Sequence, residues 1–104
     1  MKLSTKQQLF CKAMVNLISY GNSLGYEFTF GDAYRADTCT HGHPKSTHRH
    51  RLALDLNLFV DDEYITDGAH PAWVVLHDYG EKLGLSRMIK NDANHFSMTY
   101  MGVR

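Results

Sequence analysis

The sequence predicts an α+β fold: a small antiparallel sheet with helices packed on one side. Two long segments place apolar residues at helical spacing, and several short segments alternate apolar and polar residues. There is no regular strand–helix–strand alternation and no glycine-rich phosphate loop, which argues against a parallel sheet. With 104 residues the chain is expected to form one domain, residues 1–104, with a core that needs no disulfides.

Composition limits the classes of partner. Eleven basic residues balance eleven acidic ones, so no long-range field attracts nucleic acid or a membrane surface, and this argues against a small histidine-metal nuclease. No segment is long enough to span a bilayer, and the N-terminus lacks a signal-peptide core. We therefore expect a monomer that is made in the cytoplasm and does not associate stably with membranes. The two cysteines form no CxxC pair, which excludes a cysteine zinc ribbon.

The first helix is expected to begin at Ser4, because Ser4 and Gln7 have the spacing of a capping box. Apolar residues then recur at helical spacing, and Cys11 is expected to be a small buried side chain within that pattern. The segment from Tyr26 to Phe30 alternates large apolar and polar residues, which predicts a strand.

A polar segment from Gly31 to Arg51 is interpreted as a loop. The stretch "LALDLNLF", residues 52–59, predicts a strand whose leucines face the core while Asp55 lies on the opposite face. "VDDEYIT", residues 60–66, predicts a turn and a short strand.

A second helix is expected from Pro71 to Gly84, with His70 at its start and His77 on its surface. "HFSMTYM", residues 95–101, predicts the last strand, in which His95 lies opposite the apolar residues. If this strand pairs with residues 52–59, Asp55 and His95 share one polar surface of the sheet.

Four of the seven histidines fall between His41 and His50, so this stretch could be a metal site, a catalytic site or a solvated loop. A carboxylate such as Asp55 is costly on a buried strand unless it is paired or metal-bound. Spacing alone leaves a self-contained polar cluster as the simpler interpretation. On the same grounds Asp92 could be an ordinary turn residue, and Arg35 could form a surface salt bridge.

Three motifs change this balance. "STHRHRLALD", residues 46–55, resembles the S-x-H-x-x-G-x-A-x-D motif of the zinc D-alanyl-D-alanine carboxypeptidases and phage L-alanyl-D-glutamate endolysins. "DANH", residues 92–95, resembles the D-x-x-H motif of the same family, and "GDAYR", residues 31–35, resembles its tyrosine–arginine segment. The order and approximate spacing of all three are similar to those of the family.

The resemblance implies a single zinc peptidase catalytic domain with the Zn²⁺ site on the polar face of the sheet. The implied zinc ligands are His48, Asp55 and His95. Asp92 takes the position of the catalytic base, and Arg35 that of the group that stabilises the oxyanion. Ser46 takes the position of the motif serine, which supports the site by hydrogen bonding. His41, His43 and His50 match nothing in the motifs and are expected to be solvated loop residues; a substrate contact stays open for His50, because it neighbours His48.

The implied substrate is the stem peptide of bacterial peptidoglycan, which a phage enzyme would reach after release through a breached membrane. Because the motifs place no dedicated carboxylate clamp at the zinc, the internal L-alanyl-D-glutamate bond is the expected target. A D-alanyl-D-alanine carboxypeptidase and a non-catalytic zinc-stabilised wall-binding module are the alternatives. The chain departs from the motifs at Arg51, where the family has glycine, and at Ser97, where it has an acidic residue.

Overall fold

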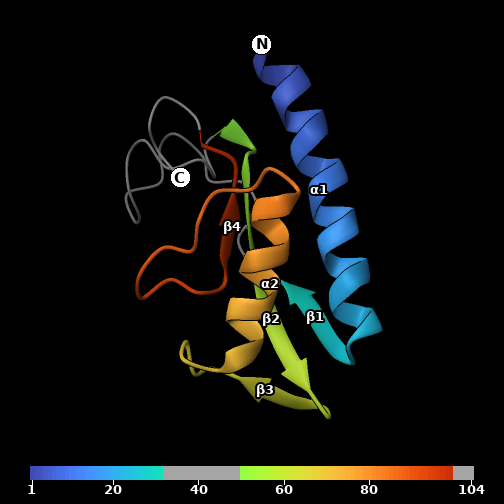
Figure 1. The fold of residues 1–104 in the computed structure, drawn as a ribbon, viewed down its shortest axis with the longest axis vertical. Coiled ribbons are helices and arrows are strands. Elements are labelled where there is room, and N and C mark those ends of the chain that lie inside the picture. Colours follow the sequence, from blue (N-terminus) through green and yellow to red (C-terminus); the bar gives the residue numbers. More distant parts are fainter. Residues whose placement is uncertain (32–49, 100–104) are drawn as a thin grey trace.

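The computed structural model describes residues 1–31 and 50–99 and confirms the predicted α+β class (Figure 1). The described elements are α1 (Leu3–Ser23), β1 (Tyr26–Phe30), β2 (Ala53–Val60), β3 (Glu63–Ile65), α2 (Pro71–Lys82) and β4 (His95–Ser97). The predicted segments therefore form the expected types of element. No helix within these residues is long and apolar enough to cross a membrane.

The sheet is antiparallel and built around β2. β1 pairs along one edge of β2, and the backbone N–H of Gly31 extends that edge by donating to the carbonyl of Asp55. The other edge is shared: β4 pairs with the first half of β2 and β3 with the second half. β2 is thus the only described strand with partners on both edges, which suits its long alternating pattern (Figure 1).

The two faces of β2 have opposite character. Leu52, Leu56 and Leu58 are fully buried on the core face. Asp55 and Asn57 lie between them in sequence and therefore point to the other face, because side chains alternate along a strand. The sequence-based division of this strand into a core face and a polar face is confirmed.

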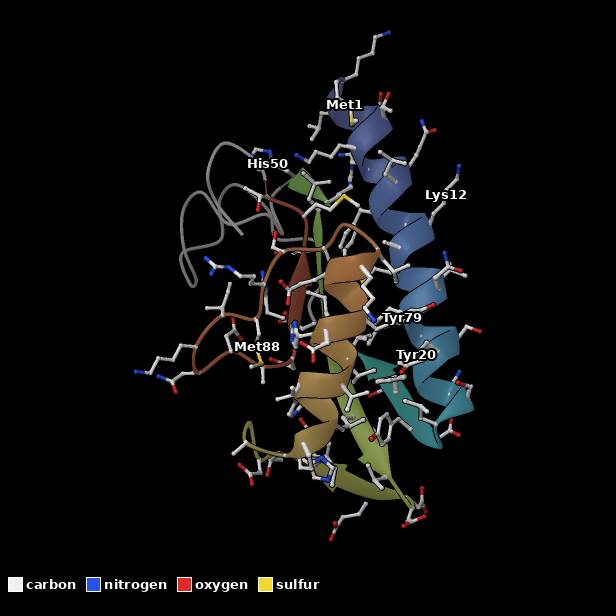
Figure 2. The ribbon with its side chains drawn as sticks, viewed as in Figure 1. Met1, Lys12, Tyr20, His50, Tyr79 and Met88 are labelled. Carbon is white, nitrogen blue, oxygen red and sulfur yellow. The ribbon has the colours of Figure 1, made fainter. Side chains whose placement is uncertain are left out.

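Both helices cover the core face (Figure 1). The helix residues buried in the core are Phe10, Ala13, Met14 and Leu17 of α1 and Ala72, Trp73 and Leu76 of α2. The helices also contact each other through Tyr20 and Tyr79, whose rings stack with centroids 3.9 Å apart (Figure 2). The polar face of the sheet is left without a helix among the described residues.

The predicted capping box is wrong. The N-cap of α1 is Lys2 and makes no side-chain cap bond, so Ser4 lies inside the first turn. Gln7 instead donates its Nε2 hydrogen to the carbonyl of His50 at 2.8 Å. The side chain of Gln7 therefore binds a residue far away in the sequence instead of capping the start of α1.

Two further expectations about burial are wrong, both because of helix phase. Cys11 is exposed, since the buried positions of α1 lie on the opposite side of the helix. His77 is buried and 3% exposed rather than at the surface, because it shares a helical face with Trp73 and Leu76. His70 is a helix-start residue as predicted: it is the N-cap of α2, and its Nδ1 accepts from the N–H of Ala72 at 3.1 Å.

The turns around β2 use left-handed backbone. Asp61 and Asp62 join β2 to β3 with φ of 51° and 66°, values that suit the tight two-residue turn of a hairpin. Arg51 has φ of 55° just before β2 begins. Glycine adopts this region without steric cost, and glycine is what the resembled motif carries at this position. The turn before β2 therefore has a backbone conformation that favours glycine, although the residue there is Arg51.

We predict that Arg51→Gly gives a more stable protein than Arg51→Ala. Both variants lose the arginine side chain equally, but only alanine keeps a Cβ in the left-handed region, which disfavours it by roughly 1 kcal/mol. Chemical denaturation of the two variants measures the difference. Equal stabilities, or a more stable alanine variant, would contradict the strain assigned to this turn.

Candidate active site

Strand pairing brings Asp55 and His95 together. β2 and β4 pair with Asp55 directly opposite His95, so their side chains lie on the same face of the sheet. The carbonyl of Asp55 points toward β1, where it accepts from Gly31. Asp55 and His95 are thus a pair without mutual backbone hydrogen bonds, the arrangement in which facing side chains approach most closely.

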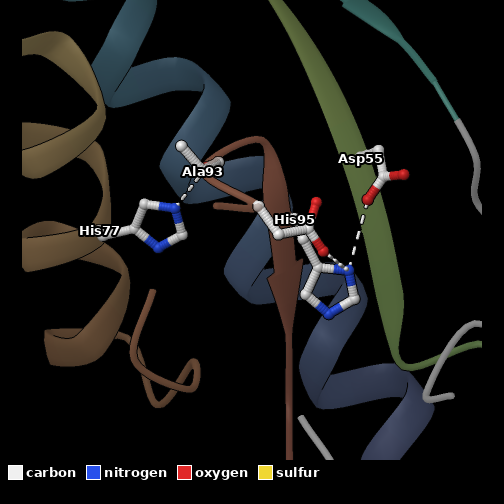
Figure 3. Close-up of polar contacts among 5 residues, drawn as sticks. Asp55, His77, Ala93 and His95 are labelled. Atoms are coloured by element: carbon white, nitrogen blue, oxygen red, sulfur yellow. Dashed lines mark hydrogen bonds and ion pairs between the residues drawn. The ribbon is translucent and has the colours of Figure 1, made fainter. Parts of the chain in front are cut away.

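Oδ1 of Asp55 lies 3.3 Å from Nδ1 of His95 (Figure 3). A charge-assisted N–H···O bond is usually shorter, about 2.7–2.9 Å. Two ligands bound ~2.0–2.1 Å from one tetrahedral zinc ion lie about 3.3 Å apart. The spacing of the two atoms therefore fits a shared metal ion better than a strong direct hydrogen bond.

Burial favours a defined role for the pair. His95 is 6% exposed, and the side chain of Asp55 is 19% exposed. Ser97, at the position where the resembled family has an acidic residue, is fully buried on β4 and pairs opposite Ala53. Two small uncharged residues, Ser97 and Ala53, therefore form the next pair but one along these strands, and Asp55 supplies the carboxylate nearest to His95 among the described residues.

Asp92 is both a turn residue and a neighbour of His95. Its backbone N–H donates to Ile89, and its carbonyl accepts from the N–H of His95 at 3.1 Å. The turn brings its Oδ2 to 4.0 Å from Nδ1 of His95, while the side chain is 49% exposed. Because this carboxylate is half-exposed and lies beside the buried His95, it can exchange protons with a water or substrate bound next to that histidine.

Gly31 lets β1 approach the site closely. A Cβ at this position would lie 3.2 Å from Cβ and 3.3 Å from the carbonyl oxygen of Asp55. Both contacts are tighter than ordinary packing, so a larger residue would push on the strand beside Asp55. The glycine of "GDAYR" thus has a structural role that the sequence pattern did not reveal.

Several predicted site residues lie outside the described residues: His48, Arg35 and Ser46, together with His41 and His43. Within residues 1–31 and 50–99, no three His, Cys, Asp or Glu side chains form a group that could hold a metal. The structure thus brings together Asp55, His95 and Asp92 of the predicted site. His50 is described, and Gln7 of α1 holds its backbone carbonyl close to the start of β2.

A pocket of about 700 Å³ adjoins Asp92. It lies beside β2, between β3 with the residues that follow it and the segment 88–94, and neither Asp55 nor His95 is among its lining residues. Its lining includes Asn57, Tyr64, Thr66, Trp73, Lys90 and Asp92. A pocket of this size with mixed polar and aromatic walls suits a small molecule or a few residues of a peptide.

His77 contacts the segment from Asp92 to His95, here called the site segment, from the core side of the sheet. Its Nε2 donates to the carbonyl of Ala93 at 2.6 Å, and Figure 3 shows it on the opposite side of β4 from Asp55 and His95. Burial lowers the pKa of His77; the hydrogen bond to Ala93 opposes this shift, and the charge of His95 reinforces it. The nearby Glu81 and Asp78 act weakly to raise that pKa.

Sequence reasoning missed three residues that shape the site: Gly31, Gln7 and His77. The helical phase could have identified His77, because it lies one residue after Leu76 and four after Trp73. No local signal marks Gly31 or Gln7, since both act on residues far away in the sequence.

No family model and no curated protein matches this chain.

We predict that His77 makes the folded protein sensitive to acid. An unfolded histidine has a pKa of about 6.5, and the folded value is lower, so the unfolded chain binds more protons between these two values. The stability due to neutral His77 is fully present above pH 6.5 and is lost as the pH falls through this window.

The free energy of unfolding, measured by urea denaturation from about pH 7.5 to about pH 5, tests this. The wild-type protein should lose more stability over this range than His77→Gln, which has no group to titrate. Parallel pH profiles for the two proteins would show that His77 does not titrate differently on folding.

Proposed function

We propose that this chain is a zinc-dependent peptidoglycan peptidase that hydrolyses the stem peptide of the bacterial cell wall. One observation carries the proposal: β2 and β4 set Asp55 and His95 3.3 Å apart, with the carboxylate of Asp92 beside them. These are the three described residues that the motifs assign to zinc binding and proton transfer. The left-handed backbone of Arg51, at the glycine position of the motif, also supports the proposal.

His95 through Nδ1 and Asp55 through Oδ1 would hold the zinc ion, with His48 as the third ligand. Two histidines and one carboxylate are a common zinc donor set in hydrolases and leave one position open. When bound, zinc polarises a carbonyl as a Lewis acid and lowers the pKa of water, which supplies a nucleophile near neutral pH.

Asp92 acts as the general base in this proposal. Its carboxylate is half-exposed and lines the pocket, so it can take a proton from the attacking water. The same carboxyl group then gives a proton to the amine that leaves. The backbone N–H of Asp92 donates to the carbonyl of Ile89, and the carbonyl of Asp92 accepts from the N–H of His95, so the backbone that carries this carboxylate is fixed during both steps. Arg35 would stabilise the oxyanion, and Ser46 would support the ligands by hydrogen bonding.

The internal L-alanyl-D-glutamate bond is the proposed target. The ground for this choice is that the motifs place no dedicated carboxylate clamp at the zinc; the pocket of about 700 Å³ that Asp92 borders would hold part of the stem peptide. In this proposal the protein acts as a phage lysis enzyme on the wall after its release from the cell.

One observation favours a second candidate, the D-alanyl-D-alanine carboxypeptidase. Lys90 lines the pocket that Asp92 borders, and a carboxypeptidase needs a cation for the free carboxylate of its substrate. Lys90 could serve a side-chain carboxylate of an internal substrate equally well, so the products of the reaction must distinguish the two activities. A non-catalytic zinc module has no comparable support, because it needs no half-exposed carboxylate beside its ligands.

We predict that the purified protein binds about one equivalent of zinc through the proposed ligands. Asp55→Asn, His95→Gln and His48→Ala should each weaken zinc binding greatly, because each removes one of three ligands. Titration calorimetry and metal analysis after dialysis measure the effect.

His41→Ala and His43→Ala are the matched controls and should keep the zinc. Normal zinc binding by all three ligand variants would contradict the proposed centre. Loss of zinc in the control variants would indicate a general histidine cluster instead.

We predict that the zinc-loaded protein clears a suspension of purified peptidoglycan, and that mass spectrometry finds new L-alanine carboxyl ends and D-glutamate amino ends. Asp92→Asn should retain zinc but lower hydrolysis by about 10²–10⁴-fold, the usual contribution of a general base. Arg35→Ala should also retain zinc and turn over more slowly.

Release of free D-alanine without clearing would select the carboxypeptidase instead. Full hydrolysis by Asp92→Asn would exclude Asp92 as the base. No new chain ends from any wall preparation, despite bound zinc, would leave the non-catalytic module as the better description.

A further inference from the structure

The segment between Asp92 and His95 is held by its backbone carbonyls. The carbonyl of Asp92 accepts from the N–H of His95 at 3.1 Å, and that of Asn94 accepts from Leu56 on β2 at 2.9 Å. Between them, the carbonyl of Ala93 accepts from Nε2 of His77 at 2.6 Å. Two of these three bonds are made by the backbone, and the third comes from a side chain of α2.

The ring of His77 makes a second contact with the same part of the chain. It stacks on Phe96 with centroids 4.1 Å apart and planes inclined by 9°. Ala93 and Phe96 each follow one of the proposed functional residues, Asp92 and His95. His77 therefore touches the segment at two points, which limits both its translation and its rotation.

Packing alone does not account for a histidine at this position. His77 is 3% exposed among apolar residues such as Leu76 and Trp73, where an aliphatic side chain would avoid the cost of burying polar atoms. An imidazole supplies what an aliphatic residue lacks: a flat ring for Phe96 and a donor for the buried carbonyl of Ala93.

We propose that His77 is a positioning residue that fixes the Asp92 carboxylate and the His95 imidazole from the core side of the sheet. It acts through the backbone of this segment, because it lies on the opposite side of β4 from Asp55 and His95 (Figure 3). The expected effect of His77 on hydrolysis rests on the proposed function. Its expected effect on the order of the Asp92–His95 segment does not. Since a displacement of about 1 Å can lower a rate by about 10²-fold, loss of this support should lower kcat more than it changes KM.

Two variants of His77 separate its contacts. His77→Phe keeps a flat ring for stacking and lacks the donor, whereas His77→Gln keeps an N–H donor and lacks the ring. Tyr79→Leu is the matched control, because Tyr79 lies in the same helix and stacks on Tyr20 rather than on the site segment. If His77→Phe fails to fold, His77→Met, which also lacks a donor, replaces it.

Amide hydrogen exchange of the Asp92–His95 segment gives a readout that needs no activity. His77→Phe should accelerate exchange of the His95 amide relative to the amides of β1, and His77→Gln should restore much of the protection. Tyr79→Leu should lower overall stability without this local effect. In the hydrolysis assay, His77→Phe should lower kcat by about 10–10²-fold with KM little changed, and His77→Gln should recover part of the rate.

The proposal is overturned if His77→Phe and Tyr79→Leu give the same exchange pattern in this segment. It is also overturned if His77→Phe accelerates exchange equally in all strands, because His77 is then a core residue only. Should the wild-type protein hydrolyse no wall material, the proposed function fails, yet the exchange experiment still decides whether His77 positions the segment.

Discussion

The pairing of β4 with β2 is the constraint on which the candidate site depends. Three residue pairs define it, and one of them joins the proposed zinc ligands Asp55 and His95. Because side chains alternate along a strand, a slip of one residue would turn His95 into the core and Phe96 onto the polar face. The register is protected by burial: Phe96 is 1% exposed and packs with Trp73 beneath the sheet. The hydrophobic core thus sets the geometry of the polar site.

The same short strands serve the core on one face and the site on the other, and this arrangement links stability to function. Both helices pack on the core face, so the described part of the polar face is free of helices (Figure 1). The turn that presents Asp92 is tied to this core from below, because α2 contributes His77 to the carbonyl of Ala93. A change in the packing of α2 should therefore affect the polar face even though no α2 side chain lies on it.

The sequence predicted the elements well because their signals are local. Alternation along residues 52–59 predicts β2, and "VDDEYIT" predicts the turn and short strand that follow it. The expectations that fail concern a distant partner or the phase of a helix. Gln7 binds the carbonyl of His50 instead of capping α1, and the phase of α2 places His77 under β4 instead of at the surface. The sequence predicts that Asp55 and His95 lie close together only if their two strands pair, and a single sequence does not determine which strands pair. His48, Arg35 and Ser46 lie outside the described residues, so their proposed roles rest on the motifs.

The proposed zinc centre is tested most sharply by a crystal structure of the zinc-loaded protein, with the metal located by anomalous scattering at the zinc edge. If the proposed centre is right, one strong peak lies on the polar face, ~2.0–2.2 Å from both Nδ1 of His95 and Oδ1 of Asp55. A direct hydrogen bond between these two atoms, with zinc bound elsewhere or not at all, would contradict it.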